Sequence, residues 1–241
     1  MANIELVSFE RLDYSIPSHI EEISKEFADL FKIRRAYVSE YCSLIKTSKR
    51  WDMSNISDKL DKWITKMQRY TGVRKFLEIA KRAFESCTSK EEIDSLRGAM
   101  MEALVIGSFG GSENLEKDNY GWGARVDINI PNTPVEKVRY KCTLHQETDC
   151  SNRSTVDFGY WNGSHGKFYE CKVQPMGIGC KEVKYMQHLK DRLGQHQISN
   201  EMFFVCADPT EEIKIKLTSL GLGPLYKAIG IQELTQMLKA G

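Results

Sequence analysis

The sequence predicts an α/β protein with a central mixed sheet flanked by helices and a helical region at its N-terminus. Three patterns in its 241 residues support this. Apolar residues recur at helical spacing through much of residues 1–88, and the stretch 155–173 alternates with the two-residue period of strands. A short apolar run at 202–206 lies between two helical patterns. Helices and strands that alternate along a chain are typical of α/β domains.

We expect residues 1–88 to form a helical, basic region and residues 89–241 to form the α/β domain. Helical spacing in the first region is carried by Ile20, Ile23, Phe27, Leu30 and Phe31, then Leu60, Ile64 and Met67, then Phe76, Leu77 and Ala80. Between Lys32 and Arg82 there are fourteen Lys and Arg against five Asp and Glu, a local net charge of +9 in a chain of net charge +1. Positive charge is therefore concentrated in this region.

The second region should open with a helix. Ser89 followed by Glu92 forms a capping-box pattern, and apolar residues continue at helical spacing to Val105. A polar loop is expected at 107–123; its glycines lack the lysine and serine of a phosphate-binding loop, so it is not a P-loop. Strand-like segments follow at 124–130 and 135–144.

The remaining elements can be assigned in order. The stretch 155–173 predicts a β-hairpin that turns at 162–166, and 181–193 predicts a helix. The apolar run 202–206 suits a buried strand. Pro209 at the first turn indicates another helix, and 228–231 predicts a last strand before a closing helix.

The hairpin carries three charged residues that point to chemistry. Glu170 and Lys172 are two apart on one strand and share a face, while Asp157 can lie across the hairpin from them. Charged groups inside a sheet are costly unless they are paired or used. Two carboxylates and one ammonium that converge suit a hard divalent cation and a phosphate.

Asp157 followed by Glu170-x-Lys172 after a hairpin resembles the motif of the PD-(D/E)xK nuclease superfamily, whose fold is restriction-endonuclease-like. Val156 stands where the family usually has proline. The resemblance covers roughly residues 90–240. It implies Mg²⁺, with Mn²⁺ as a substitute, held by Asp157, Glu170 and the backbone carbonyl of Cys171. It further implies Glu102 as a second-shell or second metal ligand and Gln187 as a positioning residue.

Several alternatives remain open at this stage. Asp157, Glu170 and Lys172 can also form a simple cross-strand salt bridge on a surface hairpin. Asp127 is a rival for the first acid because it also lies on a strand-like run. Glu102 can be a plain helix-surface residue, and Asp191 stands where one group of the family has a tyrosine after the glutamine. His165 is expected to be a polar turn residue.

The basic residues of the N-terminal region also have two interpretations. Lys59, Lys62, Lys66 and Arg69 are candidates for nucleic-acid binding, because cations that neutralise phosphates release counterions and give affinity without sequence readout. The alternative is a solvated helical face whose aromatic residues simply pack.

Cysteine usage and hydropathy indicate a cytoplasmic protein. The seven cysteines are scattered, as is typical of reduced thiols. Cys142, His145 and Cys150 are zinc-binding residue types, but their spacing is not a standard one, and Cys171 or Cys180 would have to supply a fourth ligand. No apolar run approaches the ~18 residues of a membrane span, and the N-terminus lacks the pattern of a signal peptide.

The expected function is therefore that of an Mg²⁺-dependent phosphodiesterase. The resemblance implies a DNA endonuclease of bacterial or phage origin, in restriction, defence or recombination. A ribonuclease is the alternative within enzymes, and a non-catalytic nucleic-acid-binding or assembly protein on the same fold is the alternative outside them. We expect DNA as partner, a homodimer, and a partner protein for any ATPase or targeting step, because no ATPase motif is present.

Overall fold

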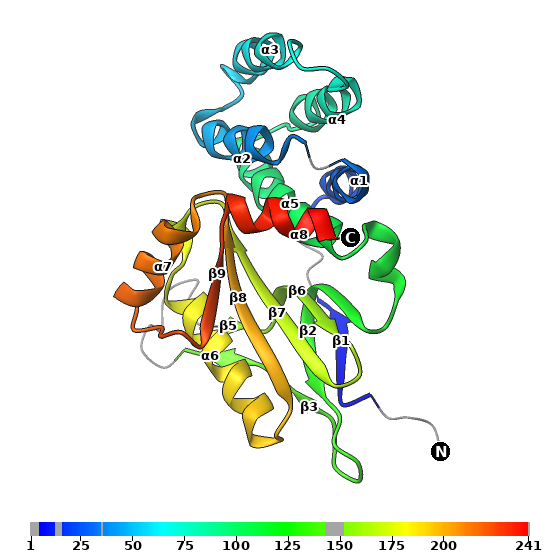
Figure 1. Ribbon diagram of the computed structural model, residues 1–241, viewed down its shortest axis with the longest axis vertical. Helices are drawn as coiled ribbons and strands as arrows, with labels where there is room; N and C mark the ends of the chain where they lie inside the picture. Colours follow the sequence, from blue (N-terminus) through cyan, green and yellow to red (C-terminus); the bar gives the residue numbers. More distant parts are fainter. Residues whose placement is uncertain (1–4, 13–15, 35, 143–151, 241) are drawn as a thin grey trace. The chain divides into compact units, whose positions relative to one another are not determined.

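The protein is described here as a computed structural model that covers residues 5–12, 16–34, 36–142 and 152–240 (Figure 1). The chain forms two compact units, each of which combines distant segments. One unit comprises Met1–Tyr14 and Glu113–Gly230, and the other comprises Ser15–Ser112 and Ile231–Gly241. We call them the sheet unit and the helical unit. The expected division near residue 88 falls inside the helical unit.

The sheet unit is an α/β structure with a mixed central sheet, as the sequence predicts. The strand order is β1-β2-β6-β7-β8-β9, with β3 paired to β2; β4 pairs with β5 in a small second sheet. β1, β2, β6 and β7 are antiparallel neighbours, while β8 runs parallel to both β7 and β9. The strands are β1 Val7–Arg11, β2 Tyr120–Ile128, β3 Glu136–Lys137, β4 Tyr140–Lys141, β5 Asn152–Arg153, β6 Val156–Trp161, β7 His165–Lys172, β8 Ser199–Cys206 and β9 Tyr226–Ile229.

Helices connect the parallel strands. After the short 3₁₀ turn η3 (Pro175–Gly177), α6 (Cys180–Gln195) links β7 to β8, and α7 (Thr210–Ser219) links β8 to β9. Figure 1 shows α6 running beside β8. Its apolar stripe, which includes Met186 and Leu189, joins Phe168 and Phe204 of the sheet in one buried cluster. Parallel strands need such crossovers, and burial of this stripe holds the crossover against the sheet.

The strand β1 departs from the helical character that the sequence predicts for residues 1–88. Val7–Arg11 pairs with β2 along its whole length, from Val7 opposite Ile128 to Arg11 opposite Ala124. Its partner strand lies far away in the sequence, and five residues alone carry no local pattern that predicts a strand.

The helical unit contains α1 to α5 and the last helix, α8. Ser24 of α1 donates a hydrogen bond from its hydroxyl to the carbonyl of Ala99 in α5, at 2.9 Å. A Cβ at Gly107 would lie 2.9 Å from the carbonyl oxygen of Ala28, so the glycine lets α1 and α5 approach closely. This packing is why α5 belongs here rather than with the sheet. The helices are α1 Ser18–Ile33, α2 Val38–Thr47, α3 Ile56–Met67, α4 Arg74–Glu85, α5 Lys90–Ser108 and α8 Ile231–Ala240, with a 3₁₀ turn η1 at Ser48–Arg50.

The start of α5 is capped, though not by a full capping box. The Ser89 hydroxyl accepts a hydrogen bond from the N–H of Glu92, as expected, but the Glu92 carboxylate accepts from the N–H of Thr88. The expected loop 107–123 is shorter: α5 runs to Ser108, a 3₁₀ turn η2 covers Ser112–Glu116, and β2 begins at Tyr120.

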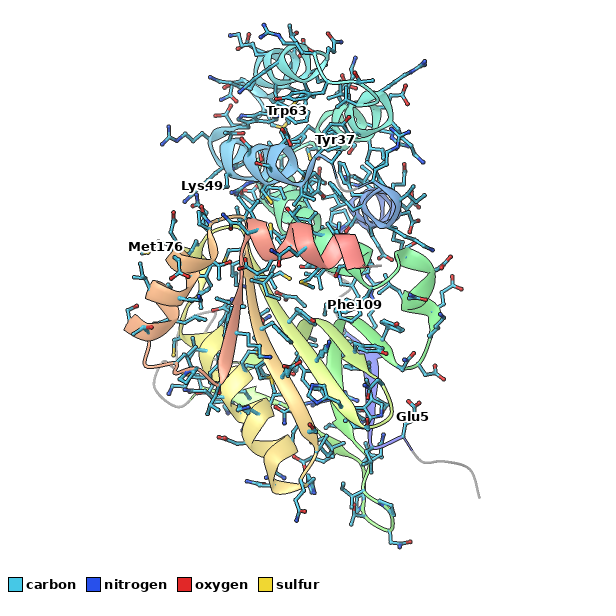
Figure 2. All side chains as sticks on the ribbon, in the orientation of Figure 1. Glu5, Tyr37, Lys49, Trp63, Phe109 and Met176 are labelled. Atoms are coloured by element: carbon cyan, nitrogen blue, oxygen red, sulfur yellow. The ribbon has the colours of Figure 1, made fainter. Side chains whose placement is uncertain are left out.

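Aromatic residues fill the interior of the helical unit. The rings of Phe27 and Tyr41 lie 4.8 Å apart, and Tyr37 stacks on Phe76 at 5.7 Å. Figure 2 shows Tyr37 and Trp63 among these helices. These rings are engaged in packing inside the unit. Within the described residues, no helix has the length and apolar character needed to cross a membrane.

Candidate functional site

The hairpin that carries the predicted acids is present. The Oδ1 of Asn162 accepts hydrogen bonds from the N–H groups of Ser164 and His165, at 3.0 and 2.7 Å. Gly163 has a φ of 92°, a conformation that favours glycine. Local chemistry thus sets the turn, which fixes the register of β6 against β7.

The two strands of the hairpin separate near the acids. Backbone pairing joins Phe158–Trp161 of β6 to Gly166–Tyr169 of β7 and stops there. Beyond it, the N–H of Cys171 donates to Oδ2 of Asp157 at 2.7 Å. A carboxylate therefore takes the place of a ladder partner, because a buried N–H needs an acceptor. This bond holds Asp157 beside the end of β7.

Glu170 and Lys172 lie on the face of β7 that α6 covers. Glu170 is fully buried, and Nζ of Lys172 lies 2.8 Å from its Oε1. The Lys172 ammonium is therefore the charged partner of Oε1. Burial raises the pKa of Glu170 to about 7, against the lowering effect of Arg153. Burial disfavours the Lys172 ammonium, but Glu170 raises the pKa of Lys172 above its ordinary value overall.

An arginine joins the two acids. Nη2 of Arg153, on β5, lies 3.0 Å from Oδ1 of Asp157 and 2.5 Å from Oε2 of Glu170. Its Nε donates to the carbonyl of Thr155 at 3.2 Å. One nitrogen therefore serves both carboxylates.

A third acid comes from α6. Oε1 of Glu182 lies 3.2 Å from Nζ of Lys172, and Oε2 accepts a hydrogen bond from the N–H of Gly179 at 3.0 Å. Nη1 of Arg153 lies 3.8 Å from the same Oε1 of Glu182. Burial alone would raise the pKa of Glu182, but Lys172 and other neighbours lower it overall. Glu182 thus remains ionised while it both caps α6 and holds the lysine.

Tyr185 lies one helical turn after Glu182, and its hydroxyl is buried with no hydrogen-bond partner among the described residues. Its ring lies 6.0 Å from the Arg153 guanidinium. Burial is the main reason that the pKa of Tyr185 lies above its ordinary value. The orphaned hydroxyl adds a polar group to the surroundings of the charged cluster.

The rival acid, Asp127, has a different partner. Arg125 is almost wholly buried and binds Asp127 through two nitrogens, at 2.5 and 2.8 Å, and it also contacts Glu10. Asp127 therefore belongs to a separate ion-pair group, whereas Asp157 is the acid that lies beside Glu170.

The donor set can be tested for a divalent cation. No group of three or more His, Cys, Asp or Glu side chains in the described part of the chain is arranged to hold a metal ion. Mg²⁺, however, commonly uses only one or two carboxylates, with water and substrate oxygens completing its shell. Asp157 and Glu170 already share one positively charged group, which stands in for a cation. These residues fit such an ion, provided that Arg153 moves.

Two further predicted site residues lie on helices. Gln187 is half-buried on α6, about 140° around the helix axis from Glu182. It therefore lies on a different face of α6 from the acid that contacts Lys172. Glu102 is half-buried on α5 of the helical unit. The metal-ligand role of the Cys171 carbonyl stays a prediction, as do the roles of Gln187 and Glu102.

The predicted basic face is exposed. Lys59, Lys62 and Lys66 are spaced three and four apart on α3, so they share one side of the helix, and Arg69 follows its end. Asp58 pairs with Lys62 at 2.7 Å. Nucleic-acid binding by this face stays a prediction.

The zinc hypothesis lies mostly outside the described residues, which exclude His145 and Cys150. Cys142 and Cys171 are buried, and Cys180 is partly exposed. His165 lies at the start of β7, where its Nδ1 is 2.7 Å from the Ser199 hydroxyl, so it belongs to a hydrogen-bonded surface group.

Arg153 and Glu182 are members of the cluster that sequence reasoning does not identify. Glu182 has a usable signal, since it is the third residue of a helix that begins after Gly179, where an acid caps the helix. Arg153 has none, because its two-residue strand is recognisable only through its pairing with β4.

Comparison with known proteins adds little to this geometry. No family model matches the chain, and no curated protein matches it. Among solved structures, the crystal structure of protein VC1899 from Vibrio cholerae is similar over 98% of this chain, at 14% identity and a TM-score of 0.43. The chain spans 57% of the length of that one.

Proposed function

We propose that the sheet unit is a restriction-endonuclease-like domain that hydrolyses phosphodiester bonds with Mg²⁺, and that DNA is its substrate. The observation that carries the proposal is the meeting of Asp157 and Glu170 at one cationic nitrogen, with Lys172 beside Glu170 on the same strand. The order of antiparallel strands, α6 and a parallel β8 within the sheet unit supports it, because it agrees with the order that the motif resemblance implies for these elements.

Each residue has a role that matches its surroundings. Asp157 and Glu170 would hold the cation, with waters and a substrate oxygen as further ligands. Mg²⁺ bound there would make a water more acidic and offset negative charge on the phosphate. Lys172 would position the attacking water and stabilise the negative charge that develops on the phosphate oxygens. Glu182 would help Glu170 to keep the ammonium of Lys172 charged and in place.

Burial makes this arrangement suited to chemistry. Glu170 lies wholly inside the protein, while Lys172 keeps about a fifth of its side chain exposed. The cluster therefore keeps some contact with solvent through Lys172, and charges that are largely buried interact more strongly than in water.

The experiment is a cleavage assay with the full chain. Supercoiled plasmid, linear duplex, single-stranded DNA and RNA are incubated with Mg²⁺, Mn²⁺ or EDTA. The proposal expects metal-dependent cleavage of DNA that Lys172→Met abolishes. Lys227→Met is the matched control, because Lys227 is a lysine of the same unit that pairs with Glu201 instead.

The substrates separate the alternatives. Cleavage of RNA alone would indicate a ribonuclease. Binding without cleavage of any substrate would indicate a nucleic-acid-binding protein and would overturn the proposed activity. Equal loss of cleavage in Lys227→Met and Lys172→Met would show that Lys172 has no specific role in cleavage, and the assignment of the active site would be wrong.

A further inference from the structure

Arg153 occupies the place that the proposed function gives to the metal ion, so the role inferred for it rests on that function. Its Nη2 contacts Asp157 Oδ1 and Glu170 Oε2 at 3.0 and 2.5 Å. These are one oxygen from each of the two proposed metal ligands. An Mg²⁺ ion bound to both would lie about 2.0–2.1 Å from them, and so in contact with the guanidinium.

The net charge of the cluster also indicates that Arg153 and a divalent cation compete for the same place. When ionised, Asp157, Glu170 and Glu182 outnumber Arg153 and Lys172 by one negative charge. A divalent cation added to all five groups would make the cluster net positive, with a guanidinium against the ion. Departure of one cationic side chain restores neutrality, and like charges this close inside a protein repel strongly.

Arg153 is the cation that can leave. It lies on β5, a two-residue strand in the small second sheet, and its side chain reaches the acids from there. Lys172, by contrast, lies at the end of β7 in the central sheet, where its backbone is opposite Cys206 of β8. A rotation of the Arg153 side chain would free both carboxylates without any change in the central sheet. A free guanidinium matches the oxygens of a phosphate with two donors.

We propose that Arg153 is a built-in competitor of the divalent cation: it neutralises Asp157 and Glu170 when no metal is bound, and it moves to the substrate phosphate when metal binds. Linkage has two consequences here. The metal affinity of the free protein is reduced by the fraction of molecules in which Arg153 still holds the acids. Substrate phosphate, which gives Arg153 another partner, raises that affinity.

The first test measures Mn²⁺ binding to the full chain by calorimetry and electron paramagnetic resonance, without nucleic acid. Arg153→Met should bind Mn²⁺ about tenfold more tightly than the wild type or better, because the ion no longer displaces an ion pair. Arg192→Met is the control: Arg192 also pairs with a carboxylate, Glu136, in the same unit. Its Mn²⁺ affinity should match the wild type. Equal or weaker Mn²⁺ binding by Arg153→Met would overturn the proposal.

A second arm tests the phosphate. A phosphorothioate duplex that resists cleavage should increase the Mn²⁺ affinity of the wild type several-fold, and that of Arg153→Met less. An equal increase in both proteins would show that Arg153 does not respond to substrate phosphate, contrary to the proposal.

Arg153→Lys covers the case in which Arg153→Met does not fold. Lysine keeps one charged nitrogen but loses the Nε hydrogen bond to the Thr155 carbonyl that holds the guanidinium in place. Mn²⁺ should therefore bind more tightly than to the wild type but less tightly than to Arg153→Met. An unchanged affinity in this variant would also overturn the proposal. If the affinity of Arg153→Lys is unchanged while the wild type binds Mn²⁺ and cleaves DNA, the proposal for Arg153 fails but the proposed function does not. Absence of Mn²⁺ binding in every protein would overturn both.

Discussion

One carboxylate, that of Glu182, joins the start of α6 to Lys172: its Oε2 accepts from the N–H of Gly179 at 3.0 Å, and its Oε1 lies 3.2 Å from the lysine Nζ. The position of the ammonium is thus coupled to the helix that follows the hairpin. A residue outside the three-residue motif therefore has a direct influence on the motif.

Glu182→Gln tests this coupling. Glutamine keeps an oxygen for the Gly179 N–H but loses the charge that attracts Lys172, so kcat for cleavage should fall about 10- to 100-fold while KM for DNA stays unchanged. Steady-state kinetics separates the two parameters. Glu201→Gln, which alters a carboxylate paired with Lys227, should keep wild-type kcat. A rise in KM at unchanged kcat would indicate that Glu182 acts on binding instead.

Asp157→Asn and Asp127→Asn distinguish the two candidate acids. Asp157→Asn should lose both Mn²⁺ binding and cleavage. Asp127→Asn should keep Mn²⁺ binding but lower the free energy of unfolding by about 2 kcal/mol, because buried Arg125 loses a charged partner. Calorimetry and thermal unfolding measure the two effects. The reverse pattern of metal binding would assign the first acid to β2.

The free energy of unfolding, measured in the presence of a chelator, should respond differently to substitution of Lys172 and of Glu170. Lys172→Met leaves three carboxylates with Arg153 alone and should cost about 3 kcal/mol. Glu170→Gln removes a charge from a fully buried position and should be neutral or stabilising. Thermal unfolding in EDTA, followed by circular dichroism, compares them. Equal losses would show that Glu170 is well compensated in the folded protein.

The basic face of α3 should contribute affinity rather than chemistry. Replacement of Lys59, Lys62, Lys66 and Arg69 with glutamine should weaken DNA binding similarly for all sequences. The slope of log affinity against log salt should fall by roughly one for each phosphate that is no longer neutralised. Binding measured across a salt series provides this slope. An unchanged slope would identify the face as solvated surface.

Metal replacement after exhaustive chelation tests the ligand set. Mg²⁺ and Mn²⁺ should restore cleavage, because both suit carboxylate oxygens in six-coordinate geometry. Ca²⁺ should support DNA binding with little turnover, since its longer, looser coordination places the reacting groups less well. Cleavage with Zn²⁺ alone, or in EDTA, would contradict the site and favour Cys142, His145 and Cys150.

The sequence predicted features whose causes are local. The hairpin followed from the Asn162–Gly163 turn and the alternation of the flanking residues, and α6 and β8 followed from periodicity and an apolar run. It could not predict β1, whose partner is distant, or the division of the chain, which depends on the close packing of α5 on α1. The role of Arg153 could not be predicted for the same reason. An arginine before a hairpin carries no signal in the sequence, and only the fold brings it between Asp157 and Glu170.

The pairing of β1 with β2 has a consequence for how this protein is made. Val7 is synthesised before its partner Ile128, and the five helices from α1 to α5 lie between them in the sequence. The helical unit in turn needs α8, which follows the last strand of the sheet unit. The sheet unit therefore cannot acquire all its native contacts before β9 has been synthesised, nor the helical unit before α8. A fragment that starts at residue 89 would lack β1 and separate α5 from α1, so we expect it to aggregate rather than fold.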